Sequence, residues 1–122
     1  MSITNYAENS LLNTLRNVSF AVAGTWIKLH TGDPGEDATL LPAANTVRQS
    51  VSFSAASGGS IVSSATVTWT SVSTTETYTH FSLWDTVGPT GGNPLWKGAL
   101  SSSAAVTAGD TFQITSLTLS LD

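Results

Sequence analysis

The chain has 122 residues, of which 10% are Asp, Glu, Lys or Arg, whereas an ordinary soluble domain carries about 25%. Eighteen residues are Ser and 19 are Thr, so we expect small hydroxyls rather than charges to cover most of the surface. The net charge of −4 argues against nucleic-acid binding, and no apolar run approaches the ~18 residues of a membrane span.

Cysteine is absent, so the chain has no disulfide framework and no thiolate for metal binding or catalysis. The N-terminus lacks the basic region and apolar stretch of a secretory signal, and we therefore expect the chain to be made in a cytoplasm. A chain of this length fits one domain, predicted to span residues 1–122.

The N-terminal segment is the only one with a helical pattern, and we predict a helix over residues 4–17. Asn5 and Glu8 have the spacing of a capping box, in which each side chain satisfies a backbone donor of the first turn. An apolar stripe of three-to-four-residue spacing supports the helix and consists of Tyr6, Leu11, Leu12 and Leu15.

After Gly24 the apolar pattern changes to a period of two, which predicts short strands separated by Gly-rich and Pro-rich turns. The predicted strands are residues 25–30, 46–54, 61–70, 76–85, 95–100, 105–106 and 112–121. In the strand at 76–85, Phe81 and Leu83 face away from Tyr78, His80, Ser82 and Trp84.

The last strand contains a change of parity. Phe112 and Ile114 occupy even positions, whereas Leu117, Leu119 and Leu121 occupy odd ones. Since a regular strand cannot change faces, we predict a β-bulge near Thr115–Ser116. The fold class is therefore mainly β, an antiparallel β-sandwich or jelly roll over residues 21–122, with one N-terminal α-helix in a helical segment over residues 1–20.

Catalytic chemistry has little support. His30, His80, Asp33 and Asp85 are the candidates, but no Gly-x-Ser-x-Gly elbow accompanies them, and we predict no catalytic residue and no enzyme. The Gly-rich loop at 88–92 lacks the Lys-Ser/Thr of a phosphate-binding loop, and we predict no cofactor.

An acidic turn contains Asp33, Glu36 and Asp37, oxygen ligands of the kind that calcium prefers. Their spacing does not match an EF-hand loop, and His30 with His80 lacks a third metal ligand. We predict no metal site, although the sequence leaves calcium binding by the turn open.

Aromatic and apolar residues supply the candidate interaction sites. Trp26 and Trp84 lie on the more polar face of their strands, which suits a subunit interface, a second buried face or a stacking platform for sugars. The helix could cover its own sheet or pack against a neighbour. The predicted interface residues are Tyr6, Leu11, Leu15, Trp26, Trp84 and Trp96.

Several stretches resemble a known family. The most specific are Leu-His-Thr-Gly-Asp-Pro-Gly at 29–35 and Thr-His-Phe-Ser-Leu-Trp-Asp at 79–85, and the similarity covers nearly the whole chain. It is to small virion structural proteins of tailed bacteriophages, of the decoration, minor capsid or tail-fibre-like kind. The resemblance implies a virion component that is assembled in a host cytoplasm and has no enzymatic activity, and it carries no residue-level site.

The resemblance leaves the location on the particle open. Because fibre-shaft repeats are absent from the sequence, we expect a capsid decoration (cement) protein that binds the major capsid protein, stabilises the lattice and forms a homo-oligomer, with a trimer favoured. The alternative is a tail-associated fibre or receptor-binding module that recognises host surface glycans. In both cases we expect no nucleic-acid or membrane partner.

Overall fold

The computed structural model describes residues 2–121 and contains one helix and nine strands within that range. The elements are β1 (Ser2–Ile3), α1 (Asn5–Thr14), β2 (Trp26–His30), β3 (Gln49–Ser50), β4 (Ser60–Val62), β5 (Val67–Trp69), β6 (Glu76–Trp84), β7 (Pro94–Val106), β8 (Phe112–Ile114) and β9 (Thr118–Ser120). The predicted class, mainly β with one N-terminal helix, is confirmed. No helix in this range is long and apolar enough to cross a membrane.

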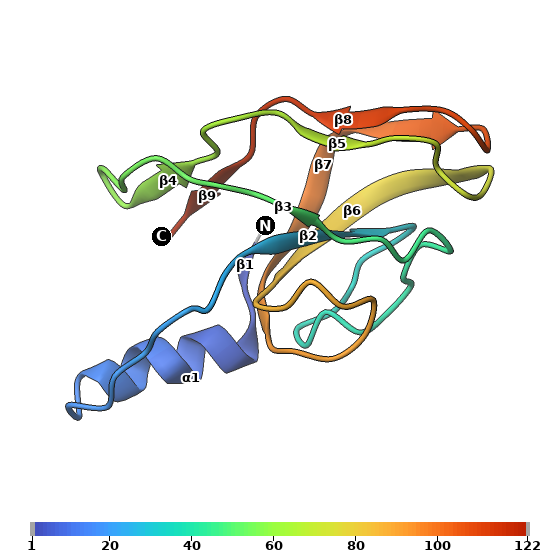
Figure 1. Ribbon diagram of the computed structural model, residues 1–122. Coiled ribbons are helices and arrows are strands. Elements are labelled where there is room, and N and C mark those ends of the chain that lie inside the picture. The colour runs from blue at the N-terminus through green and yellow to red at the C-terminus, as the bar shows by residue number, and fades with distance from the viewer. Residues whose placement is uncertain (1, 122) are drawn as a thin grey trace.

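The strands form two layers (Figure 1). A five-stranded sheet has the order β1-β7-β6-β2-β3, and all of its pairings are antiparallel. Two antiparallel pairs, β4 with β9 and β5 with β8, cover one face of that sheet. This is the layering of a sandwich, while the jelly-roll topology stays a prediction.

The core lies between these layers. Ile27, Leu29, Phe81 and Leu83 face it from the large sheet, and each is at least 97% buried. Trp69 closes the core from the covering layer, where its ring packs on Phe112 at 5.6 Å and its Nε1 donates to the Val47 carbonyl. A buried tryptophan therefore has both its apolar area and its one donor satisfied.

The helix spans Asn5–Thr14, so it begins one residue later and ends three residues earlier than the predicted range of 4–17. Thr4, rather than Asn5, is the N-cap, because its Oγ1 accepts from the Ala7 amide. The helix ends through Asn17, whose φ of +64° allows the Val18 amide to return to the Asn13 carbonyl. This pattern is a Schellman termination, with Asn in the left-handed position.

Three strand predictions need correction. Residues 46–54 form only the two-residue β3, residues 61–70 divide into β4 and β5, and residues 95–106 join into one long β7. The β6–β7 register also shifts between Tyr78 and His80. As a result Tyr78 is buried in the core against Phe112, at 5.2 Å, and does not share a face with His80 as simple alternation predicted.

The predicted irregularity near Thr115–Ser116 is present, but it separates two strands and is not a bulge within one. The chain leaves β8 after Ile114 and resumes pairing in β9. Ser63 bridges the break, because its amide donates to the Leu117 carbonyl and its Oγ accepts from the Leu117 amide, both at 2.8 Å. Ile114 and Leu117 can both be buried because the break absorbs the change of parity.

Candidate assembly surface

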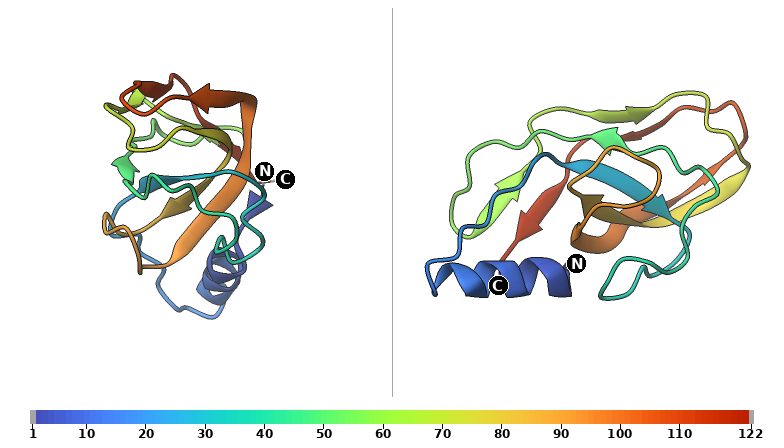
Figure 2. Two further views of the ribbon diagram at one scale, coloured as in Figure 1. Left: turned by 90° about the vertical axis from the view of Figure 1, so that its right-hand side faces the viewer. Right: turned by 60° about the horizontal axis from the view of Figure 1, so that its bottom comes forward.

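Residues 5–24 form a helical arm that extends from one end of the β body (Figures 1 and 2). Thr4 fastens its root to the start of β7. The Thr4 amide donates to the Leu95 carbonyl, and its Oγ1 donates to the Pro94 carbonyl at 2.6 Å. Because Thr4 is fully buried and also caps α1, one residue sets the direction in which the arm leaves the body.

Most of the apolar stripe on the helix is uncovered. Ala7 is its one buried residue, and the main contact of α1 is with β7. Leu12 is 63% exposed and Leu15 is 84% exposed, while Leu11 is exposed to a lesser degree. A helix of ten residues is only marginally stable by itself in water, and burial of its apolar face normally stabilises it. In this structure most of that face is exposed to solvent.

The returning segment of the arm is also apolar. Val18 and Val22 are exposed, and Phe20 packs edge-on against Tyr6 with ring centroids 6.2 Å apart. This contact holds the extended segment against the helix, so the helix and the returning segment form one unit. Leu12, Val18 and Val22 extend the apolar surface beyond the residues we predicted, and their high apolarity beside a helix was the signal available in the sequence.

Trp26 and Trp84 are direct cross-strand partners on β2 and β6. Trp84 is 7% exposed because the guanidinium of Arg48 covers its ring at 4.4 Å, and its Nε1 donates to Ser82 Oγ. Trp26 is half-buried. This face is thus largely covered by loops of the same chain, and Trp26 keeps more of its surface available than Trp84 does.

Arg48 ties two loops together on that face. Its Nη1 donates to the Thr86 carbonyl, to Thr86 Oγ1 and to the Gly91 carbonyl, each at 3.1 Å. Burial lowers the pKa of this guanidinium, while the nearby carboxylate of Asp85 opposes that shift. The contacts are all within the chain, so Arg48 acts as a clamp on the loop between β6 and β7.

His30, one of the catalytic candidates considered from the sequence, is fully buried. Its Nδ1 lies 2.8 Å from the Leu40 carbonyl and its Nε2 lies 2.7 Å from Ser82 Oγ. Since a carbonyl only accepts, Nδ1 carries the proton, and Ser82 donates to Nε2 while it accepts from Trp84. Burial is the largest cause of the lowered pKa of His30, and the neutral ring suits both hydrogen bonds.

Trp96 lies apart from the other two tryptophans. It is paired with Leu83 on β6 and with Ile3 on the edge strand β1, and its ring packs against the core. Its Nε1 is buried and has no hydrogen-bond partner among the described residues. The six predicted interface residues therefore lie in three places: Tyr6, Leu11 and Leu15 lie on the arm, Trp26 and Trp84 lie on one face of β2 and β6, and Trp96 lies apart from both.

The acidic turn is engaged by a lysine. Lys97 Nζ lies 3.3 Å from Asp33 Oδ1 and 3.4 Å from Glu36 Oε1, while Asp37 accepts from the Asn5 side chain. The amide of Gly35 and then Lys97 lower the pKa of the Asp33 carboxyl. Residues 2–121 contain no cluster of three His, Asp or Glu side chains suited to a metal.

The molecule is thus a small, charge-poor β body with a helical arm, and residues 5–24 of that arm carry half of the exposed large apolar side chains of the described residues. A model of the family described as podophage GP4 fiber I protein gp80 matches residues 2–122. The chain belongs to this family, and it is a structural component of tailed-phage virions, as the resemblance implied. A search of curated proteins finds no match.

Proposed function

We propose that the chain is a non-enzymatic subunit of a fibre on the phage virion, and that it assembles with its neighbours through the helical arm. The observation that carries this proposal is the exposed apolar stripe on a helix whose root is fixed by Thr4. Such a patch on a rigid mount is typical of a surface that a protein partner covers. The family description supports a fibre subunit over the capsid decoration protein that the sequence analysis favoured. It therefore gives no support to the major capsid protein as the partner.

The buried polar groups favour a structural role. Ser82 and His30 form the one Ser–His hydrogen bond of the described residues, which superficially resembles a nucleophile and its base. Both side chains are fully buried, and Ser82 Oγ also accepts from Trp84 Nε1, so a substrate has no path to the hydroxyl in this conformation. The pair acts as a core network that joins β2 to β6.

Host glycan recognition is a second candidate for the fibre. Trp26 is the half-buried member of the Trp26–Trp84 pair, and a tryptophan face is a usual platform for a sugar ring. Trp84 already stacks on Arg48, so the candidate platform is a single ring. Selective binding on a glycan array that disappears in Trp26→Ala, but not in Tyr6→Ala, would support this candidate; equal binding by all three proteins would remove it.

The location of the chain on the particle tests the main proposal. Antibodies raised against the purified chain and visualised with gold should label fibres of intact virions. Labelling distributed over the head surface would overturn the fibre proposal in favour of a capsid decoration protein. The same particles, stripped of the chain, should keep their thermal survival, because a fibre subunit does not clamp the lattice.

A further inference from the structure

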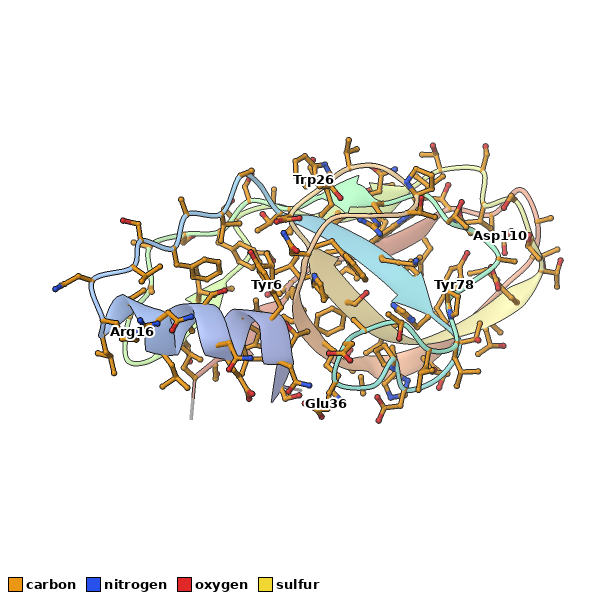
Figure 3. All side chains as sticks on the ribbon, turned by 90° about the horizontal axis from the view of Figure 1, so that it is seen from below. Tyr6, Arg16, Trp26, Glu36, Tyr78 and Asp110 are labelled. Carbon is orange, nitrogen blue, oxygen red and sulfur yellow. The ribbon has the colours of Figure 1, made fainter. Side chains whose placement is uncertain are left out.

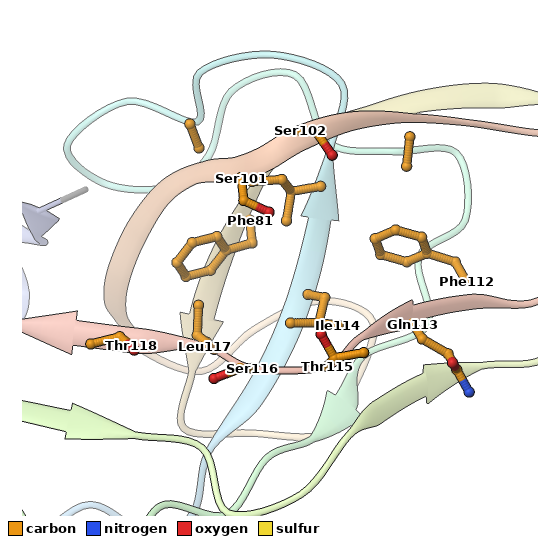
Figure 4. Close-up of a pocket in the computed structure, with 13 residues that line it drawn as sticks. Phe81, Ser101, Ser102, Phe112, Gln113, Ile114, Thr115, Ser116, Leu117 and Thr118 are labelled. Atoms are coloured by element: carbon orange, nitrogen blue, oxygen red, sulfur yellow. The ribbon is translucent and has the colours of Figure 1, made fainter.

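A groove opens on the side of the body where β7 bends. It holds about 340 Å³, and its floor consists of Phe81, Phe112, Ile114 and Leu117 (Figure 4). Ser101, Ser102 and Thr115 belong to the lining and are exposed, so they form a hydroxyl rim. The groove is therefore apolar in depth and polar at the edge, as is typical of sites that receive an apolar side chain.

The groove lies between strand edges that have no partner in the described residues. β8 pairs only with β5, β9 pairs only with β4, and β7 meets β1 only at Trp96 and Lys97. From residue 98 to residue 109 the chain has no charged side chain, and no lining residue of the groove is charged. An edge without charges lacks the usual protection against contact with another chain.

The helical arm has complementary properties. Its exposed leucines, Leu11, Leu12 and Leu15, stand at helical spacings that allow insertion into an apolar groove. No arm residue lines the groove of its own chain, and the arm points away from β8 (Figure 1). The arm and the groove can therefore meet only between two copies.

The distribution of charge favours one orientation of the arm relative to the groove. Arg16 lies near the tip of the arm and has no carboxylate partner among residues 2–121. The other three basic residues are engaged on the body, since Lys97 is ion-paired, Arg48 is buried and the half-buried Lys28 lies over the Trp84 ring. Asp110 lies in the turn between β7 and β8, two residues before Phe112 of the groove lining. Figure 3 shows Arg16 and Asp110 at opposite ends of the molecule, so a head-to-tail arrangement brings opposite charges together.

We infer that the arm of one copy docks in the β7–β8–β9 groove of the next copy, with Leu12 and Leu15 in the groove and Arg16 beside Asp110. Because the two surfaces differ, the contact is heterologous, and its repetition closes a ring or extends a filament. The inference deepens the proposed fibre function and rests on it for the expectation that copies meet, but its chemistry concerns only this chain.

The absence of native cysteine makes a crosslinking test direct. Leu15→Cys, in the arm, is mixed with a size-tagged Ser102→Cys, at the groove rim, and oxidised. We expect the mixed disulfide dimer to exceed the same product from Leu15→Cys with Val87→Cys by several-fold. Val87 is exposed in the loop between β6 and β7 and does not line the groove, so it is the matched control.

Two crosslinking results would overturn the inference. One is a Leu15→Cys homodimer as the dominant product, which would mean that two arms pack on each other. The other is equal yield with Ser102→Cys and Val87→Cys, which would mean random collision. Either result leaves the gold-labelling test of the fibre function unaffected, so the two proposals fail independently.

A charge reversal checks the register without cysteines. Arg16→Asp and Asp110→Arg should each reduce the fraction of assembled protein in sedimentation velocity, and the double variant should recover it. Asp110 Oδ2 also accepts from the Thr107 amide, so the melting temperature of each variant must be measured to confirm folding. Failure of the double variant to recover assembly, with folding intact, would contradict the Arg16–Asp110 contact.

Discussion

The arm and the β body use apolar residues in opposite ways. In the body, Trp69, Phe81 and Leu29 are at least 99% buried, and the buried polar side chains beside them are mostly hydrogen-bonded. In the arm, Leu12 and Leu15 face solvent. The burial of apolar area is the main favourable contribution to folding, so the body contains the source of the fold's stability. The apolar area of the arm can contribute a favourable free energy only when another surface covers it.

The largest change in the free energy of unfolding is expected from a substitution in the core of the β body. Trp69→Ala should lower the free energy of unfolding by about 3–5 kcal/mol, because it removes a buried aromatic ring and leaves a cavity beside Phe112. Urea denaturation followed by circular dichroism measures the change. Leu15→Ala is the matched arm variant, and it should stay within about 0.5 kcal/mol of the wild type. Similar losses in both variants would mean that the arm belongs to the folding core.

A smaller effect is expected where the two regions join. Thr4→Ala removes the N-cap and the hydrogen bond to the Pro94 carbonyl, which should cost about 1–2 kcal/mol. Hydrogen exchange of the α1 amides should accelerate while exchange in β6 stays slow. Thr14→Ala, at the far end of the helix, is the control and should leave the arm root unchanged. Unchanged exchange in Thr4→Ala would show that the arm is held by other contacts.

The pH dependence of stability should come in part from His30 in the body. The folded protein lowers the pKa of His30, mainly through burial, so the unfolded chain binds a proton more readily. Stability is therefore complete above the ordinary histidine pKa near 6.5 and falls as the pH drops below it. The melting temperature should decrease between pH 7.5 and pH 5. His30→Gln should flatten that decrease more than His80→Gln does, and the opposite ranking would refute the role of His30.

The sequence predicted the parts of the body that depend on local pattern. The alternation of Ile27 and Leu29 predicted β2, and the parity change between Ile114 and Leu117 located the break before β9. It could not show that loops of the same chain cover the second face of β2 and β6. The contact of Arg48 with Trp84 joins residues 36 positions apart, and no local pattern encodes it.

The candidate interface residues also divide into those that a local pattern predicted and those whose positions depend on tertiary contacts. The helical stripe predicted Tyr6, Leu11 and Leu15, and the structure places these three on one exposed arm. The tryptophans were chosen for their residue type, and the tertiary contacts that separate Trp96 from Trp26 have no local signature. Thr4 was missed because its role depends on the Pro94 carbonyl, 90 positions away, although Thr is a common N-cap.

The role of the arm in assembly has one direct test. Sedimentation velocity at several concentrations should show that the wild-type chain self-associates, and that the double variant Leu12→Asp/Leu15→Asp is a monomer with an unchanged melting temperature. The matched control is Leu40→Asp/Leu41→Asp, which places the same charges on two leucines that are exposed on the body and should leave association intact. A wild type that stays monomeric at high concentration, or a double arm variant that associates as the wild type does, would contradict the central claim.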